Sequence, residues 1–292
     1  MTDTLLKPDV RGFFDPATST WTYVVWSEES QDGRCAIIDS VLDYDLSSSR
    51  TSTASADKVI RFVEQRKLRT EWIIETHIHA DHLTAAHYLK EKLGGKTAIS
   101  HHIVDVLGQW LPLFQTAADT PADGSQFDHL FDDDEEFTIG ALKTRILHTP
   151  GHTPADTSFI TGDAVFAGDA MFLPDVGSGR CDFPGGSAAA SFDSAQKLLA
   201  LPADFRMYVG HDYPGANRGP LCMTTIGEQK ALNVRFHDGT RRERFVEERN
   251  RADVGKSVPE LLLPALQVNL RGGAFGKDIN GIQYIRLPVD RI

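Results

Sequence analysis

The chain has 292 residues, of which 41% are hydrophobic and 24% charged, and its 41 acidic and 30 basic residues give a formal net charge of −11. This composition is typical of a globular enzyme and excludes collagenous, disordered and disulfide-scaffold proteins. A surface this acidic repels nucleic acid and anionic lipid, so we expect neither as a partner.

The sequence also predicts a reduced, cytoplasmic protein. No apolar run approaches the ~18 residues of a membrane span, and we expect no signal peptide at the N-terminus. The three cysteines, Cys35, Cys181 and Cys222, contain no CxxC pair. An odd, sparse set of this kind favours a reducing compartment over a disulfide framework.

The first part of the chain predicts a β-hairpin followed by alternating helices and strands. Two runs rich in β-forming residues, 21–26 and 34–39, are separated by a polar turn that contains glycine. Hydrophobic spacing and terminal signals then predict further elements in chain order. These are a helix after the Ser/Thr-rich residues 51–55, a strand at 72–75, a helix from Leu83 to Gly94 and a strand at 97–100.

The second part predicts more strands and a helical C-terminus. Residues 108–135 look irregular, and the acidic run 132–136 is interpreted as a solvated turn. The later expected elements are strands at 142–147, 157–160, 164–167 and 205–209, and helices at 193–201, 225–235 and 241–250. We therefore expect a catalytic domain over 1–222 and a helical extension over 223–292 that packs on the same domain.

The densest chemical signal is a histidine-rich turn directly after the strand at 72–75. It contains His77, His79, Asp81 and His82. Imidazole and carboxylate groups are natural ligands of zinc and iron. On a tight turn, His77 and His79 can aim at one point while Asp81 and His82 reach a second point nearby.

Three later strand ends each deliver another candidate ligand. His152 lies in a Pro-Gly-His turn, Asp169 follows an apolar strand, and His211 follows the strand at 205–209. Asp163 competes with Asp169, but its Gly-Asp setting is typical of a tight turn between strands. Four strand ends with His or Asp are unlikely to have four independent structural explanations, so the sequence predicts a metal centre. His101 and His102 are interpreted as a helix start or surface pair.

The order HxHxDH, GHT, GDA and a late histidine resembles the metallo-β-lactamase superfamily. The resemblance covers roughly residues 20–215. It implies an α+β fold, a four-layer αββα sandwich, with a metal site at one edge of its two sheets.

A closer resemblance is to the persulfide dioxygenases and their bacterial β-lactamase hydrolase-like relatives. It rests on residues 75–86, 168–186, 210–215, 224–233 and 261–273. It implies one Fe(II) per subunit, held by His77, His152 and Asp169 as a facial triad that leaves positions open for sulfur and O2. The implied reaction oxidises glutathione persulfide with O2 and water to sulfite and glutathione.

The remaining site residues receive roles within this hypothesis. His79, Asp81, His82 and His211 would hydrogen-bond the ligands or bound water. We expect Tyr213 to point its hydroxyl at the open face as a catalytic group. Arg180 would bind a substrate carboxylate, with a salt bridge to Asp182 or a bond to a backbone carbonyl as the alternative. Cys181 is expected to serve packing rather than redox chemistry, and the enzyme is expected to be a homodimer.

Two other functions stay open. In a dinuclear zinc hydrolase of the glyoxalase II type, acting on a thioester or lactone, two groups of ligands would each hold one metal. These groups are His77, His79 and His152 for one metal and Asp81, His82 and His211 for the other, with Asp169 as the bridge. A non-catalytic metal sensor or sulfur-binding regulatory protein is disfavoured because the four strand-end ligands leave an open site rather than a closed structural one. The DNA-binding element that would favour a sensor is also missing, since no basic recognition helix is visible.

Overall fold

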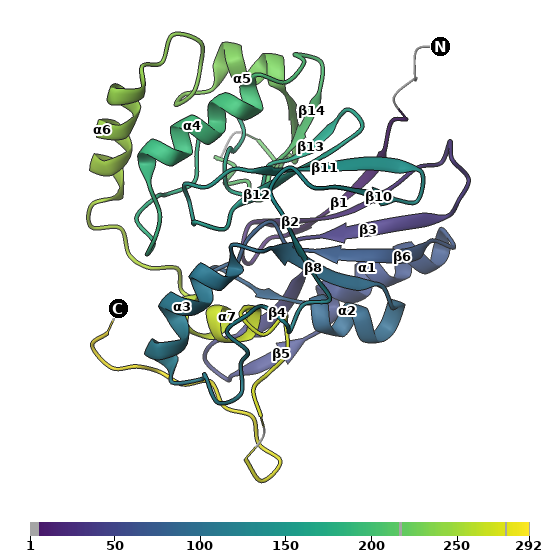
Figure 1. The fold of residues 1–292 in the computed structure, drawn as a ribbon, viewed down its shortest axis with the longest axis vertical. Helices are drawn as coiled ribbons and strands as arrows, with labels where there is room; N and C mark the ends of the chain where they lie inside the picture. The colour runs from purple at the N-terminus through teal and green to yellow at the C-terminus, as the bar shows by residue number, and fades with distance from the viewer. Residues whose placement is uncertain (1–5, 216–217, 278, 292) are drawn as a thin grey trace.

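The computed structural model describes residues 6–215, 218–277 and 279–291. Within them, two large mixed sheets lie face to face (Figure 1). The first has the strand order β1 (Asp9–Asp15), β2 (Thr20–Trp26), β3 (Arg34–Ile38), β6 (Arg69–Ile74), β8 (Lys96–Ser100) and β9 (His129–Phe131). The second has the order β10 (Glu136–Ile139), β11 (Leu142–His148), β12 (Thr157–Thr161), β13 (Ala164–Phe166), β14 (Arg206–Tyr208) and β15 (Met223–Thr225). A small sheet has the order β5 (Arg50–Ser52), β4 (Val41–Asp45) and β7 (Leu83–Thr84).

Helices cover the outer faces of both large sheets (Figure 1). On the side of the first sheet lie α1 (Ala54–Gln65), α2 (Ala86–Leu93), α3 (Ile103–Phe114) and α7 (Leu262–Asn269). On the side of the second sheet lie α4 (Ala188–Leu199), α5 (Ile226–Leu232) and α6 (Arg242–Asp253). The predicted four-layer αββα sandwich is therefore confirmed.

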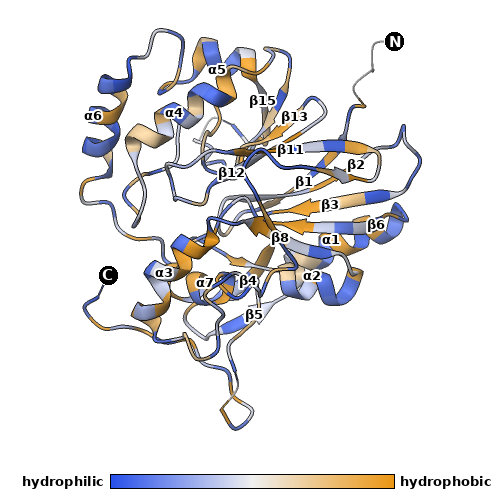
Figure 2. Ribbon diagram, viewed as in Figure 1, coloured by the Kyte–Doolittle hydropathy of each residue, from blue (hydrophilic) through white to orange (hydrophobic). Residues whose placement is uncertain are grey.

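The alternation of side chains along the strands explains the layers. On β2, Tyr23 and Val25 pack into the core between the two sheets, whereas Val24 and Trp26 pack against the helices outside. A strand with both faces buried carries apolar residues at successive positions. Figure 2 shows this as hydrophobic colour along β3 and β13, in contrast to the largely hydrophilic α6 on the outside.

The expectation of irregular structure over 108–135 was wrong at its start, because α3 extends to Phe114. The helix buries six apolar side chains at helical spacing, namely Ile103, Val106, Leu107, Trp110, Leu111 and Phe114. Pro112 lies in the last turn of the helix, where its missing N–H removes one backbone hydrogen bond without preventing the helix. No helix among the described residues is long and apolar enough to cross a membrane.

The C-terminal helices divide between the two halves of the sandwich. Phe236 and Phe245 join the core formed by the second sheet and α4. Leu262 and Leu266 instead pack with α3 on the side of the first sheet. We propose from these contacts that residues 223–292 form one folding unit with the preceding sandwich.

Candidate metal centre

Loops that follow four strands bring the sequence-predicted ligands to one edge of the sandwich. The loop after β6 carries His77, His79, Asp81 and His82, the loop after β11 carries His152, and Asp169 and His211 follow β13 and β14. The four histidines His77, His79, His82 and His211 are almost completely buried. The structure therefore brings all seven residues together.

Two sets of possible ligand atoms can be separated by distance. In the first, one atom each from His77, His152 and Asp169 lies within 4.8 Å of the other two. The second set, with the same limit, contains His79, Asp81, His82 and His211. Sequence reasoning about a dinuclear site placed His79 with His77 and His152, whereas here its ligand atom groups with the second set.

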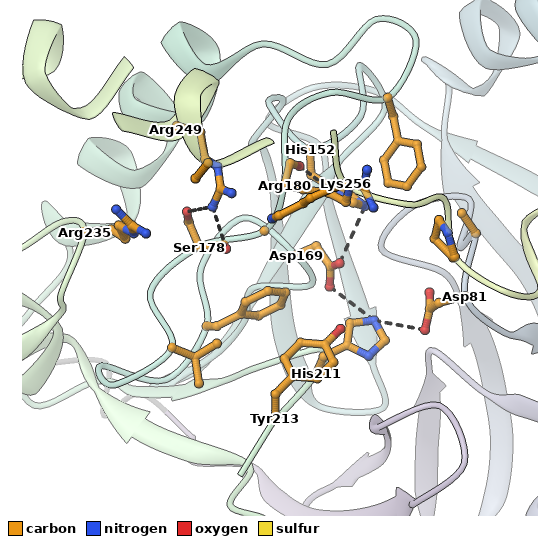
Figure 3. A pocket seen from close by; sticks show the side chains of 17 residues that line it. Asp81, His152, Asp169, Ser178, Arg180, His211, Tyr213, Arg235, Arg249 and Lys256 are labelled. Atoms are coloured by element: carbon orange, nitrogen blue, oxygen red, sulfur yellow. Dashed lines mark hydrogen bonds and ion pairs between the residues drawn. The ribbon is translucent and has the colours of Figure 1, made fainter. Parts of the chain in front are cut away.

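Asp169 lies between the two sets. Its Oδ2 is 3.5 Å from Nε2 of His152, and its Oδ1 is 3.4 Å from Nε2 of His211. His211 in turn is 3.5 Å from Oδ2 of Asp81 (Figure 3). A carboxylate in this position can bind one ion or bridge two.

Buried polar atoms without hydrogen-bond partners show that the residues present fit a cation. Among the described residues, five such atoms belong to this site: Nε2 of His77, His82 and His211, Nδ1 of His79 and Oδ1 of Asp169. Each buried, unsatisfied polar atom costs about 1–3 kcal/mol. Nitrogen and carboxylate donors gathered in this way suit zinc or iron.

The opposite nitrogen of each ring fixes its orientation. The hydroxyl of Thr76 donates to Asp39, so Nδ1–H of His77 donates to Thr76 Oγ1 at 3.0 Å and Nε2 keeps its lone pair. Likewise, Nδ1–H of His152 donates to the carbonyl of Arg180 at 2.7 Å. Such outer hydrogen bonds hold a metal-binding imidazole in the required tautomer.

His79 is held by two buried carboxylates. Its Nε2 lies 3.1 Å from Asp39 Oδ1 and 3.2 Å from Glu75 Oε2. Sequence reasoning missed both of these residues, and it also missed Thr20, whose hydroxyl lies 3.3 Å from Nδ1 of His211. Asp39 follows β3 directly, so the strand-end rule applied to the other ligands could have found it.

The charges of the site shift the pKa values of its histidines in different directions. Burial and the neighbouring His79 and His152 lower the pKa of His77 well below its usual value. Burial acts in the same direction on His79, but Asp39 and Glu75 outweigh it and raise the pKa of that ring. Against burial, Asp169 and Asp81 raise the pKa of His211. This shift favours the neutral imidazole of His77, the form that binds metal ions.

Two glycines allow the strand ends to approach so closely. Gly168 has a φ of +50°, and a Cβ there would lie 2.7 Å from Oγ1 of Thr76. A Cβ on Gly210 would lie 2.8 Å from Oδ1 of Asp169. Larger residues would force these loops apart, which explains the glycine before both Asp169 and His211.

A cavity of ≈ 430 Å³ opens above the site. Its wall combines Asp81, His152, Asp169, His211 and Tyr213 with residues from the C-terminal segment, among them Arg235, Arg249 and Lys256 (Figure 3). A neighbouring cavity of ≈ 840 Å³ shares Asp81, Arg180 and Tyr213 with the first. The two cavities therefore adjoin each other at these residues.

The two expected substrate contacts differ in their surroundings. Tyr213 is 50% exposed, and its ring stacks with that of His211 at a centroid distance of 6.0 Å. Arg180 forms a bidentate salt bridge with Asp182 at 2.6 and 2.7 Å and donates to the carbonyl of Ser257 at 2.7 Å. The alternative interactions considered for Arg180 are thus present, and a substrate contact by either residue stays a prediction.

Asp163 and Cys181 belong to neither set of possible metal ligands. Asp163 lies in the β12–β13 turn and pairs with Arg206 and Lys7. Burial raises the pKa of the Cys181 thiol to about 12, and its backbone N–H donates to Asp253 at 2.9 Å. These contacts agree with a turn role for Asp163 and a packing role for Cys181.

Comparison with known proteins places these observations in context. The model of the metallo-beta-lactamase superfamily matches residues 15–211. The chain is 45% identical to "Glyoxylase B2" of Dictyostelium discoideum, over 97% of this chain and 98% of that protein. It is 43% identical to the "Beta-lactamase hydrolase-like protein" of Xylella fastidiosa strain 9a5c, over 98% of this chain and 65% of the relative.

More distant similarities point to a second group of proteins. The chain is 29% identical to the mitochondrial persulfide dioxygenase ETHE1 of Bos taurus, over 90% of this chain and 88% of the relative. The crystal structure of ETHE1 from Myxococcus xanthus is similar with a TM-score of 0.72 and 28% identity, over 91% of this chain and all (100%) of that one.

Proposed function

Because the chain belongs to the metallo-beta-lactamase superfamily, we propose that it is a mononuclear non-haem iron persulfide dioxygenase. In the proposed reaction glutathione persulfide, O2 and water give sulfite and glutathione, so that the S–S bond breaks and the terminal sulfur is oxidised. Similarity to a persulfide dioxygenase over most of the chain supports this substrate class. A bound Fe(II) would supply the redox chemistry, which zinc lacks.

The observation that carries this proposal is the separate grouping of His77, His152 and Asp169. Two imidazoles and one carboxylate are the ligands of non-haem iron oxygenases, which keep positions open for two reactants. The possible ligand atom of His79, the residue that a dinuclear site would add to this set, groups instead with the other four-residue set.

The protein residues around the triad hold and orient it. The carbonyl of Arg180 and the hydroxyl of Thr76 fix the rings of His152 and His77. His211 faces Asp169 from the other side and limits its movement. This preorganisation keeps the carboxylate in place while substrate enters the cavity.

The cationic part of the cavity wall supports an anionic substrate. Arg249 and Lys256 both pair with the single carboxylate of Asp253, which leaves one positive charge in excess. Arg235 is 3.6 Å from Glu248, a carboxylate already bonded by Arg244 at 2.8 Å. In a chain with a net charge of −11, this local excess is suited to carboxylates of a glutathione derivative.

One alternative retains specific support. The four-residue set of His79, Asp81, His82 and His211 offers a second metal position. Together with the similarity to a protein named as a glyoxylase, it favours a dinuclear thioester hydrolase as the competing function.

Anaerobic purification with metal counting, followed by two assays, separates the alternatives. We expect one iron per chain, O2 uptake with glutathione persulfide and sulfite as the product. Two metals per chain, with thioester hydrolysis in the absence of O2 and no O2 uptake, would overturn the dioxygenase proposal and support the hydrolase.

A further inference from the structure

A second group of histidines lies outside the candidate metal centre. His101 and His102 lie between β8 and α3, Asp133 lies in the turn between β9 and β10, and His148 is the last residue of β11. One possible ligand atom each from His101, His102 and Asp133 lies within 4.8 Å of the other two. Segments far apart in the sequence therefore bring imidazole and carboxylate groups together at the surface.

Asp133 lies between two of these imidazoles. Its Oδ1 is 3.1 Å from Nε2 of His102, and its Oδ2 is 3.5 Å from Nδ1 of His148. The rings of His102 and His148 stack at a centroid distance of 4.0 Å, and the ring of His101 is also 4.0 Å from that of His102. The carboxylate thus serves as a common partner for more than one histidine.

The hydrogen bonds of two rings leave one nitrogen of each ring with a lone pair. Nε2–H of His148 donates to the carbonyl of Pro154 at 3.0 Å, so in the neutral ring Nδ1 carries the lone pair. This lone pair faces an oxygen of Asp133, and two acceptors in this arrangement repel each other unless a proton or metal ion lies between them. Nδ1–H of His101 similarly donates to the carbonyl of Phe131 at 3.1 Å. Backbone carbonyls commonly orient metal-binding histidines in this way.

Further carboxylates increase the negative charge around the cluster. Asp132 Oδ1 lies 3.5 Å from Nδ1 of His101, and Asp105 Oδ2 lies 3.9 Å from Nδ1 of His102. The side chains of His101 and His102 are 41% and 23% exposed, so an ion can enter from solvent and retain water ligands.

We propose that His101, His102 and Asp133, with His148 as an additional ligand, form a second binding site for a divalent transition metal such as Zn²⁺. Imidazole nitrogen with carboxylate oxygen favours zinc, nickel and copper over magnesium and calcium, which prefer oxygen-only sites.

The position of this site gives it a structural consequence. His148 lies immediately before the loop that carries His152, and it also holds Pro154 at the far side of that loop. An ion bound here links the start of α3 and the β9–β10 turn to the base of the loop. Binding of a metal ion at this second site is therefore expected to stabilise the segment that positions His152.

The test compares zinc binding by variants of the iron-loaded enzyme, with Zn²⁺ titrated against a chromophoric chelator. We expect the wild type to bind one more equivalent of Zn²⁺ than either His102→Asn or Asp133→Asn, or to bind that equivalent at least about tenfold more tightly. Even residues that only hydrogen-bond a metal ligand contribute a factor of this size to metal affinity. His87→Asn is the matched control, because His87 forms an exposed pair with Glu91 at 3.4 Å elsewhere on the surface.

Melting temperatures and iron content complete the experiment. Relative to the Tm of the same variant without zinc, zinc should raise the Tm of the wild type and of His87→Asn more than that of His102→Asn, while all variants retain the same iron content. Equal zinc binding by the wild type, His102→Asn and Asp133→Asn would overturn the proposal. Since only differences between variants are used, the result does not depend on the reaction catalysed at the buried centre.

Discussion

Asp169 and His211 face each other across 3.4 Å, oxygen Oδ1 to nitrogen Nε2, and neither atom has a hydrogen-bond partner among the described residues. Asp169 belongs to the three-residue set and His211 to the four-residue set. The mononuclear and the dinuclear hypotheses for the metal centre therefore make different predictions for these two residues.

Replacing these two residues should have different effects on metal content. Asp169→Ala should lose the iron, because one of the three proposed ligands is removed. His211→Asn should keep about one iron per chain and lower turnover by about 10–100-fold, the range for outer hydrogen-bond partners. Elemental analysis and O2 uptake measure both quantities. Loss of metal to the same extent in both variants would instead indicate that both sets bind metal.

His152→Ala should abolish iron loading and O2 consumption while the fold is retained. The side chain lies at the cavity wall, and its removal leaves the surrounding strands intact. Circular dichroism and iron analysis of the purified variant check this. An active variant that still contains iron would show that His152 is not a ligand.

Asp163→Asn should leave turnover nearly unchanged but reduce stability in a pH-dependent way. Although burial raises the pKa of Asp163, Arg206 and Lys7 outweigh it and lower the pKa below its usual value. The charged carboxylate therefore stabilises the folded state above the unfolded pKa of about 4, and this contribution disappears as the pH falls through the lower folded value.

Urea unfolding at neutral and at acidic pH measures this effect. The wild type should exceed Asp163→Asn in unfolding free energy at pH 7, and the difference should shrink below about pH 4. A difference that does not change with pH contradicts the ion-pair explanation, and loss of turnover contradicts the choice of Asp169 as the ligand.

The double variant Arg235→Gln/Lys256→Gln should raise KM for glutathione persulfide by about tenfold or more with little change in kcat, because charge-assisted bonds contribute about 1.5–3 kcal/mol. Steady-state kinetics at several salt concentrations test this, and the KM of the variant should depend less on salt than the KM of the wild type. Arg251→Gln is a suitable control, since Arg251 pairs with Glu247 on the exposed part of α6. An unchanged KM would exclude this wall from substrate binding.

Cys181 should resist alkylation in the folded protein. Its buried thiol has a pKa raised to about 12, so the reactive thiolate is scarce at pH 8. Mass spectrometry after iodoacetamide treatment should find modification at the less buried Cys222 before Cys181, and Cys181→Ala should remain active. Rapid alkylation of Cys181 with loss of activity would indicate a redox role.

Much of the architecture follows from local sequence signals. The histidines and carboxylates after β6, β11, β13 and β14 could be found because strand ends gather at one edge of a layered fold. The predicted resemblance to the superfamily and to its hydrolase-like and persulfide dioxygenase members is confirmed by the matches.

Residues whose role depends on packing could not be found in the same way. Asp39 follows β3 as the other candidates follow their strands, but its contact with His79 depends on the parallel pairing of β3 with β6, which no local signal specifies. The sequence marks Arg235 and Lys256 only as charged residues of a helical region. Similarly, His101 and His148 are separated by a long stretch of chain, and only the folded sheets bring their surroundings together.

The cationic wall of the cavity has an evolutionary consequence. Arg235, Arg249 and Lys256 all lie beyond residue 211, where the match to the superfamily ends. If this wall binds substrate as proposed, changes confined to this tail would alter selectivity without touching the candidate metal ligands. Chimeras that exchange only the tail offer a direct route to reprogramming which molecules the enzyme accepts.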